Sequence, residues 1–124
     1  MEEFSTTVNI HDVSPDAMWA VISMWSGEYV ALAGFGAAVV QADEGKPGAM
    51  RTLTFAGAQF QEQLDTLDAA NKTFSYHFFG AVPFPVEGYK ASVTVTPADK
   101  GCNVLWRGEC KFTCDHKDRP NFPM

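Results

Sequence analysis

Four polar side chains capable of acid–base or hydrogen-bonding chemistry occur within stretches that otherwise alternate apolar and polar residues. They are Arg51, Glu62, Tyr76 and Tyr89, and each has an apolar residue two positions away. Side chains on an extended strand point alternately to the two faces of a sheet, so these four are expected to share its apolar face. A mostly apolar wall with a few polar groups is typical of a pocket that orients an apolar ligand.

Glu62 is the candidate general acid or base, because burial among apolar side chains raises the pKa of a carboxyl group. Tyr89 or Arg51 would then polarise a carbonyl oxygen of the substrate. In the alternative interpretation, Arg51 and Glu62 form a buried ion pair across a hairpin that only fixes strand register. Tyr76 and Tyr89 have a similar alternative, as core aromatic residues whose hydroxyls are satisfied.

The apolar part of the predicted wall comes from the same strand faces. Period-two alternation groups each polar residue with apolar neighbours on its own strand. Arg51 shares a face with Leu53 and Phe55, and Glu62 shares one with Phe60, Leu64 and Thr66. Tyr76 is grouped with Phe74 and Phe78, and Tyr89 with Ala91, Val93 and Val95. Residues 81–86 form an apolar loop stiffened by two prolines. Its Phe84 is either a gate at the mouth of a cavity or a packing residue against Val86 and a neighbouring strand. His77 has the opposite parity to Tyr76 and is expected to face outward, and His11 ends a strand.

The elements that position these residues follow from periodicity and turn signals. Strands are predicted over residues 4–11, 37–40, 50–55, 59–67, 73–79, 89–96 and 102–113. Ser14-Pro15-Asp16 predicts the start of a helix of about three turns that ends near Gly27, with an apolar stripe of Trp19, Ala20, Ile22 and Trp25. Residues 28–36 are expected to be irregular. The order indicates an α+β fold, a meandering antiparallel sheet with helices on one face.

Size and charge narrow the functional classes. A chain of 124 residues with 46% hydrophobic residues is expected to form a single domain over residues 1–124. The net charge of −6 disfavours nucleic acid and anionic membranes as partners. No segment has the length and apolarity of a membrane span or a secretion signal, so a cytoplasmic protein is expected.

Metal and covalent chemistry receive little support. Three cysteines form no paired framework, which suits a reducing compartment. Cys110, Cys114 and His116 could suggest a metal cluster, but residues four apart on a strand lie roughly 13 Å from each other, too far to share one ion. No nucleophile elbow, phosphate loop or dinucleotide fingerprint occurs. Neither a metal nor another cofactor is expected.

The order and spacing of several motifs resemble the helix-grip (SRPBCC, START-related) superfamily of polyketide cyclases and dehydrases, lipid-transfer START domains, the major birch-pollen allergen and plant abscisic-acid receptors. The motifs are Ser14-Pro15-Asp16 with Trp19, Gly48 with Arg51, residues 62–68, and residues 89–97 followed by Gly101 and Trp106. The resemblance covers about residues 4–112. It implies a curved sheet of six to seven strands around a ligand cavity, with Glu62 and Tyr89 facing that cavity.

The last strand gives conflicting signals. The resemblance implies that Arg107 faces the cavity and contributes to ligand binding, whereas apolarity places the set containing Val104, Trp106 and Cys110 on the inner face. The sequence alone leaves both orientations open.

One departure from the superfamily concerns its long C-terminal helix, which normally closes the cavity. Residues 113–124 are polar and contain Pro120 and Pro123, so no such helix is expected. Either the chain is a shortened form or a second chain, in a homodimer, covers the exposed sheet face. The predicted function is binding of a small apolar or aromatic molecule. The alternatives are a polyketide-type cyclase or dehydratase using Glu62, and a non-catalytic dimerisation or assembly module.

Overall fold

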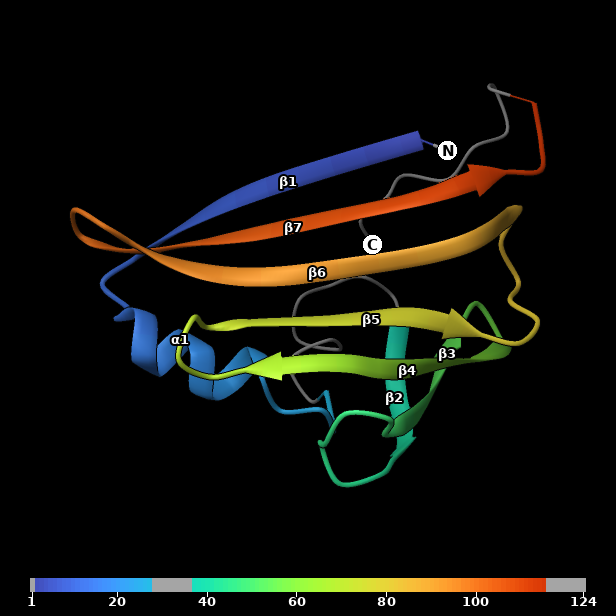
Figure 1. Cartoon of the computed structure of the whole chain (residues 1–124), viewed down its shortest axis with the longest axis horizontal. Helices are drawn as coiled ribbons and strands as arrows, with labels where there is room; N and C mark the ends of the chain where they lie inside the picture. Colours follow the sequence, from blue (N-terminus) through green and yellow to red (C-terminus); the bar gives the residue numbers. More distant parts are fainter. Residues whose placement is uncertain (1, 28–36, 116–124) are drawn as a thin grey trace.

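The computed structural model describes residues 2–27 and 37–115. Its seven strands form one antiparallel sheet in the order β1-β7-β6-β5-β4-β3-β2 (Figure 1). The strands are β1 (Glu2–His11), β2 (Ala37–Ala42), β3 (Met50–Phe55), β4 (Ala58–Asp68), β5 (Thr73–Phe79), β6 (Val86–Ala98) and β7 (Gly101–Phe112). From β2 to β7 each strand pairs with the next one along the chain, and β1 joins the sheet beside β7. The predicted α+β meander is confirmed.

Helix α1 (Pro15–Ile22) begins as predicted and ends earlier than predicted. The Ser14 hydroxyl accepts a hydrogen bond from the backbone N–H of Ala17 at 3.1 Å, and Pro15 fills the first helical position, where no N–H is needed. Ser23 caps the other end, so the predicted three turns to Gly27 were wrong. The early end lets the chain turn and bury Trp25 to 5% exposure, which a continuing helix would not do. Within the described residues α1 is the single helix, and the segment 28–36 lies outside them.

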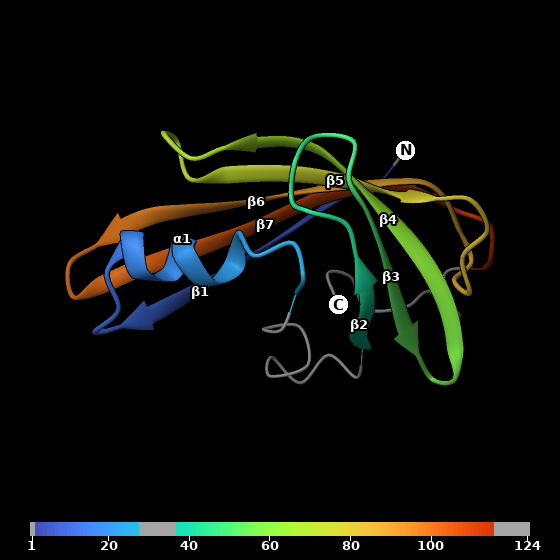
Figure 2. The same cartoon turned by 90° about the horizontal axis from the view of Figure 1, so that it is seen from below.

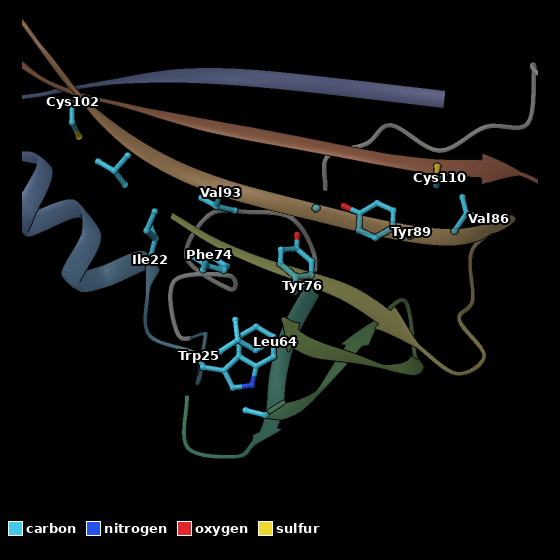
Figure 3. Packing of buried hydrophobic residues seen from close by; sticks show 13 residues of the cluster. Ile22, Trp25, Leu64, Phe74, Tyr76, Val86, Tyr89, Val93, Cys102 and Cys110 are labelled. Atoms are coloured by element: carbon cyan, nitrogen blue, oxygen red, sulfur yellow. The ribbon is translucent and has the colours of Figure 1, made fainter. Parts of the chain in front are cut away.

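The buried side chains gather on one face of the sheet, the face that carries α1, which we call the concave face. Figure 2 shows α1 beneath the strands on this side, where it contacts β6 and β7. Its fully or nearly buried residues include Leu64, Phe74, Tyr76, Tyr89, Val93, Cys102 and Cys110, labelled in Figure 3. Leu53, Phe60, Ala91 and Val95 are buried as well. Phe74 and Tyr76 alternate with less buried residues along β5, and so do Tyr89, Ala91, Val93 and Val95 along β6, which confirms the predicted inner faces of these stretches.

A β-bulge in β4 corrects one predicted member of this face. The pairing of β4 with β5 shifts register between Leu64 and Thr66. Thr66 therefore lies opposite Ser75, and their hydroxyl oxygens are 2.6 Å apart. Both side chains point away from the core. The prediction that Thr66 shares the face of Glu62 was wrong because one inserted residue reverses the alternation beyond it.

In β7 the apolar set that contains Trp106 faces the core, as the apolarity of the strand predicted. Trp106 pairs with the buried Val93 of β6, and directly opposed residues point to the same face. Arg107 pairs with Ser92 and is exposed on the opposite side of the sheet, which we call the convex face. The prediction that Arg107 faces the cavity was therefore wrong. Only every second side chain of a strand can face the core. In β7 the buried Cys102 and Cys110 belong to the same alternating set as Trp106, so this set faces the core.

The chain after β7 is described only to Asp115, and within that range no helix follows the strand. Most of the polar tail singled out in the sequence, including His116 and both prolines, lies outside the described residues. No helix in the described part of the chain is long and apolar enough to cross a membrane.

Candidate functional site

A tight hairpin brings Arg51 and Glu62 together. The turn between β3 and β4 has Ala56 at φ 49° and Gly57 at φ 82°, and two residues with positive φ match the right-handed twist of the flanking strands. This turn sets the register in which Arg51 lies directly opposite Glu62. Both side chains face the core, with 4% of Arg51 and 5% of Glu62 exposed. The predicted ion pair across the hairpin is present.

The geometry of this pair is close. Glu62 Oε1 accepts one hydrogen bond from Arg51 Nε at 2.8 Å and another from Nη2 at 2.6 Å. Charge-assisted bonds of this kind are short and roughly twice as strong as bonds between neutral groups. Breaking a buried pair by removing one partner leaves an uncompensated charge, so the two residues depend on each other.

Trp25 completes the surroundings of the arginine. The guanidinium carbon of Arg51 lies 4.0 Å from the centroid of the Trp25 ring and 5.6 Å from that of Tyr76. Arg51 Nη1 also donates to the backbone oxygen of Trp25 at 3.4 Å. The cation is thus held between two aromatic faces and a carboxylate, an arrangement that suits the planar, weakly hydrated guanidinium.

Burial decides the proton affinity of Glu62. The loss of water around the carboxylate raises its pKa above the ordinary value of 4.5, while the charge and hydrogen bonds of Arg51 act in the opposite direction. A carboxyl group with a raised pKa, near a cation and on an apolar face, fits the predicted acid–base group. The same arrangement also fits a register-fixing ion pair.

Tyr89 lies deeper in the same face, on β6. Burial raises the pKa of its phenol strongly, and the negative charge of Glu62 raises it further. The neighbouring Tyr76 hydroxyl partly opposes this rise in pKa. Figure 3 shows Tyr76 and Tyr89 adjacent on β5 and β6. The Tyr89 phenol therefore stays protonated near neutral pH, where it can donate or accept a hydrogen bond.

A cluster of aromatic rings continues from Tyr89 toward the loop between β5 and β6. The Phe78 and Tyr89 rings stack with centroids 4.0 Å apart. Phe84 of the loop packs on Phe55, Phe60 and Phe78 at centroid distances of 5.6, 5.2 and 5.7 Å. The packing interpretation of Phe84 named Val86 and a neighbouring strand, and contacts with neighbouring strands are present, to rings of β3, β4 and β5. Phe84 thus ties the loop to the aromatic part of the concave face.

The structure brings most of the predicted site residues onto one surface. Arg51, Leu53, Phe60, Glu62, Tyr76, Tyr89 and Ala91 are buried on the concave face, and Phe55, Phe78 and Phe84 are half-buried beside them. Arg107 is the exception. It lies across the sheet, at an open hollow of about 480 Å³ on the convex face whose lining also includes Lys90, Ser92 and Glu109.

His77 faces outward as expected. Its Nδ1 lies 2.8 Å from Asp65 Oδ1 on the convex face.

Trp25 is the residue of this surface that sequence reasoning did not assign to the site. It was predicted to belong to the apolar stripe of the helix, but it lies beyond the end of α1 and stacks on Arg51. The indole Nε1 of Trp25 is buried and has no hydrogen-bond partner among the described residues. No local sequence signal separates Trp25 from the helical stripe, because its placement depends on where α1 ends.

Within residues 2–27 and 37–115, no three His, Cys, Asp or Glu side chains lie close enough together to hold a metal ion. His116, the third member of the trio considered in the sequence, lies outside this range. Cys102 and Cys110 are buried free thiols on the concave face, and Cys114 is half-buried.

A seven-stranded antiparallel sheet with α1 between its first two strands is the fold shared with the START-related helix-grip superfamily. Residues 1–122 match the family described as polyketide cyclase / dehydrase and lipid transport, and the chain belongs to this family. A curated relative, the MLP-like protein 423 of Arabidopsis thaliana, is 28% identical over 89 residues. That match spans 67% of this chain and 57% of the length of the plant protein.

Solved structures show the same fold at low identity. An uncharacterized protein from Bacillus thuringiensis superposes with a TM-score of 0.73 at 20% identity, covering 94% of this chain and 85% of that one. Norcoclaurine synthase from Thalictrum flavum, in complex with dopamine and hydroxybenzaldehyde, superposes with a TM-score of 0.69 at 16% identity, covering 90% and 70% of the two chains. These likenesses establish the fold.

Proposed function

We propose that this protein binds a small, flat, apolar or aromatic molecule against the concave face of its sheet. The observation that carries the proposal is the continuous set of aromatic rings from Tyr89 through Phe78 to Phe84, next to the buried Arg51–Glu62 pair. Aromatic rings offer large contact areas with defined stacking geometry, and a few polar groups fix the orientation of a ligand.

The family and its relatives support this class of ligand. The family description includes lipid transport, and the synthase of the same fold is described in complex with dopamine and hydroxybenzaldehyde, two small aromatic molecules. On this chain the half-buried rings of Phe78 and Phe84 would suit an aromatic ring better than a long flexible lipid chain. The Tyr89 hydroxyl would donate to a carbonyl or phenol oxygen of the ligand.

Binding can be tested with a panel of hydroxylated aromatic aldehydes, flavonoids and fatty acids, followed by quenching of tryptophan fluorescence. We expect the aromatic compounds to bind and Phe84→Ala to weaken that binding by about tenfold, the factor that corresponds to about 1.4 kcal/mol. Phe79→Ala is the matched control, because Phe79 ends the neighbouring strand with 47% of its surface exposed. Equal losses in both variants, or no binding by any compound, would contradict the proposal.

A second candidate, a cyclase or dehydratase activity, is favoured by the raised pKa of Glu62. In a dehydration, the Glu62 carboxylate would take a proton from the carbon next to a carbonyl. It would then return that proton to the departing hydroxyl, which leaves as water, while Tyr89 or Arg51 holds the carbonyl oxygen. Glu62→Gln should abolish turnover of a β-hydroxy ketone and retain its binding. Unchanged turnover in this variant would exclude the role of Glu62.

A further inference from the structure

The free edge of β1 is the longest unpartnered backbone in the described part of the sheet. β1 is the terminal strand and pairs on one side only, with β7. It has ten residues, and all except Phe4 and Ile10 are exposed. An unpaired strand edge offers a row of N–H and C=O groups to another strand. Proteins usually guard such edges with lysine, proline or a bulge, and β1 contains none of these.

The β1 sequence is complementary to itself when read in the opposite direction. Two antiparallel copies that keep their concave faces on the same side must oppose residues of the same parity. With Thr7 opposite Thr7, Phe4 lies opposite Ile10 and Thr6 opposite Val8, all on the concave face. On the convex face, Ser5 lies opposite Asn9.

The polar ends of β1 favour the same register. Glu3 of one copy lies opposite His11 of the other, where the imidazole can donate a hydrogen bond to the carboxylate, while Glu2 lies opposite Asp12, just beyond the strand. Within its own chain Glu3 lies opposite Glu109, another carboxylate, and the described residues give Glu3 no ion-pair partner. The register shifted by two residues, with Thr6 opposite Thr6, would set the Glu2 carboxylate against Ile10 and remove both Glu3–His11 pairs. A carboxylate opposite an apolar side chain such as Ile10 loses water without gaining a partner, whereas a carboxylate opposite a hydrogen-bond donor is favourable.

We infer that β1 is a homodimerisation edge, through which two copies form one continuous antiparallel sheet about a two-fold axis at Thr7. The apolar Val8 side chain, 49% exposed in the single chain, would be covered by Thr6 of the second copy. The contact is isologous, so it closes as a dimer and leaves both concave faces available.

Disulfide trapping tests the register. In a Cys114→Ser background, which removes the one cysteine that is not buried, Thr7→Cys should form a disulfide-linked dimer under mild oxidation, because the two positions are opposed. Ser5→Cys is the matched control on the same face of the same strand. Its two copies would lie roughly 13 Å apart along the strands and should stay unlinked. Equal cross-linking of both variants, or none in Thr7→Cys, would overturn the inference.

The native mass provides a readout without new cysteines. Light scattering at tens of micromolar should give twice the mass of the 13.6 kDa chain. Val8→Lys should shift the population to the single-chain mass, and Val40→Lys should not. Val40 is an equally exposed valine on β2, the opposite edge strand. A single-chain mass for the unmodified protein, or equal effects of both substitutions, would overturn the inference, and a native circular dichroism spectrum verifies that each variant is folded.

Discussion

Glu62 accepts both hydrogen bonds from Arg51 at the same carboxylate oxygen, Oε1, and the two donors lie 2.8 and 2.6 Å away. The second oxygen, Oε2, takes no part in these bonds. The pair thus bridges β3 and β4 in the register that the hairpin turn sets, and it leaves one carboxylate oxygen of Glu62 outside the ion pair. Whether the site binds or also catalyses depends on what that oxygen does.

Loss of Arg51 should destabilise the fold through the charge left behind. We expect Arg51→Met to lower the free energy of unfolding by about 3–5 kcal/mol, the range seen when one partner of a buried ion pair is removed. The double variant Arg51→Met/Glu62→Leu should regain most of this loss, because no buried charge remains. Urea denaturation of the wild type and these two variants measures both values. If the double variant is no more stable than Arg51→Met, the buried charge is not the cause.

The same pair should make stability depend on pH in a defined direction. The folded-state pKa of Glu62 is raised, so the folded protein binds the proton more tightly than the unfolded chain. Its contribution to stability is full below the ordinary pKa of 4.5 and is lost as the pH rises toward the folded pKa. Arg51 opposes this shift, so Arg51→Met should lose stability more steeply above pH 4.5 than the wild type.

Denaturation midpoints measured from pH 4 to 8 test this slope. The double variant Arg51→Met/Glu62→Leu lacks the carboxyl group and serves as the baseline. A gain in stability of Arg51→Met over the baseline as the pH rises would show that the pKa of Glu62 is lowered by folding.

Tyr89 should contribute a separate effect in alkali. Its pKa is raised by burial and by Glu62, so its contribution to stability is full below the ordinary value of 10.0 and is lost as the pH rises above it. Tyr89→Phe should remove this alkaline loss and cost about 1 kcal/mol at neutral pH through the lost hydrogen bond. Denaturation from pH 8 to 11 measures both effects. An identical alkaline decline in the wild type and the variant would contradict the assignment.

Gly108 should resist substitution because of a ring, not because of its backbone. A Cβ atom at this position would overlap the Phe4 ring, which stacks on Tyr89 with centroids 5.8 Å apart. Overpacking of this kind typically costs about 1–3 kcal/mol, so Gly108→Ala should lower stability by that amount. Gly57→Ala is the informative contrast, since its Cβ would meet open space and its cost would come from positive φ alone. Recovery of Gly108→Ala by Phe4→Leu would identify the ring as the cause, and no recovery would argue against it.

Much of the fold followed from alternation in the sequence. The parity of Phe74, Tyr76 and Phe78 placed β5 correctly because the strand is regular. The Arg51–Glu62 pairing also followed, since a short hairpin leaves few registers. Thr66 was placed on the wrong face because a β-bulge adds one residue, and nothing in the local composition marks that insertion. Arg107 was misplaced by the resemblance, whereas apolarity alone was correct.

Trp25 marks a different limit of sequence reasoning. Its contact with Arg51 joins residues 26 positions apart in the chain and depends on where α1 ends. Helix ends are set by competition between capping and tertiary burial, and here the burial of one indole outweighs a further helical turn. No local pattern specifies that outcome.

The measurement that tests the central claim most directly is nuclear magnetic resonance mapping during titration with a hydroxylated aromatic ligand. The account predicts shifts at concave-face positions such as Leu53, Phe60 and Ala91. Their neighbours of opposite parity, Thr52, Gln61 and Ser92, should change much less. Shifts that centre on the convex face, around Arg107 and Lys90, would contradict the account, and so would the absence of any shift with every ligand of the panel.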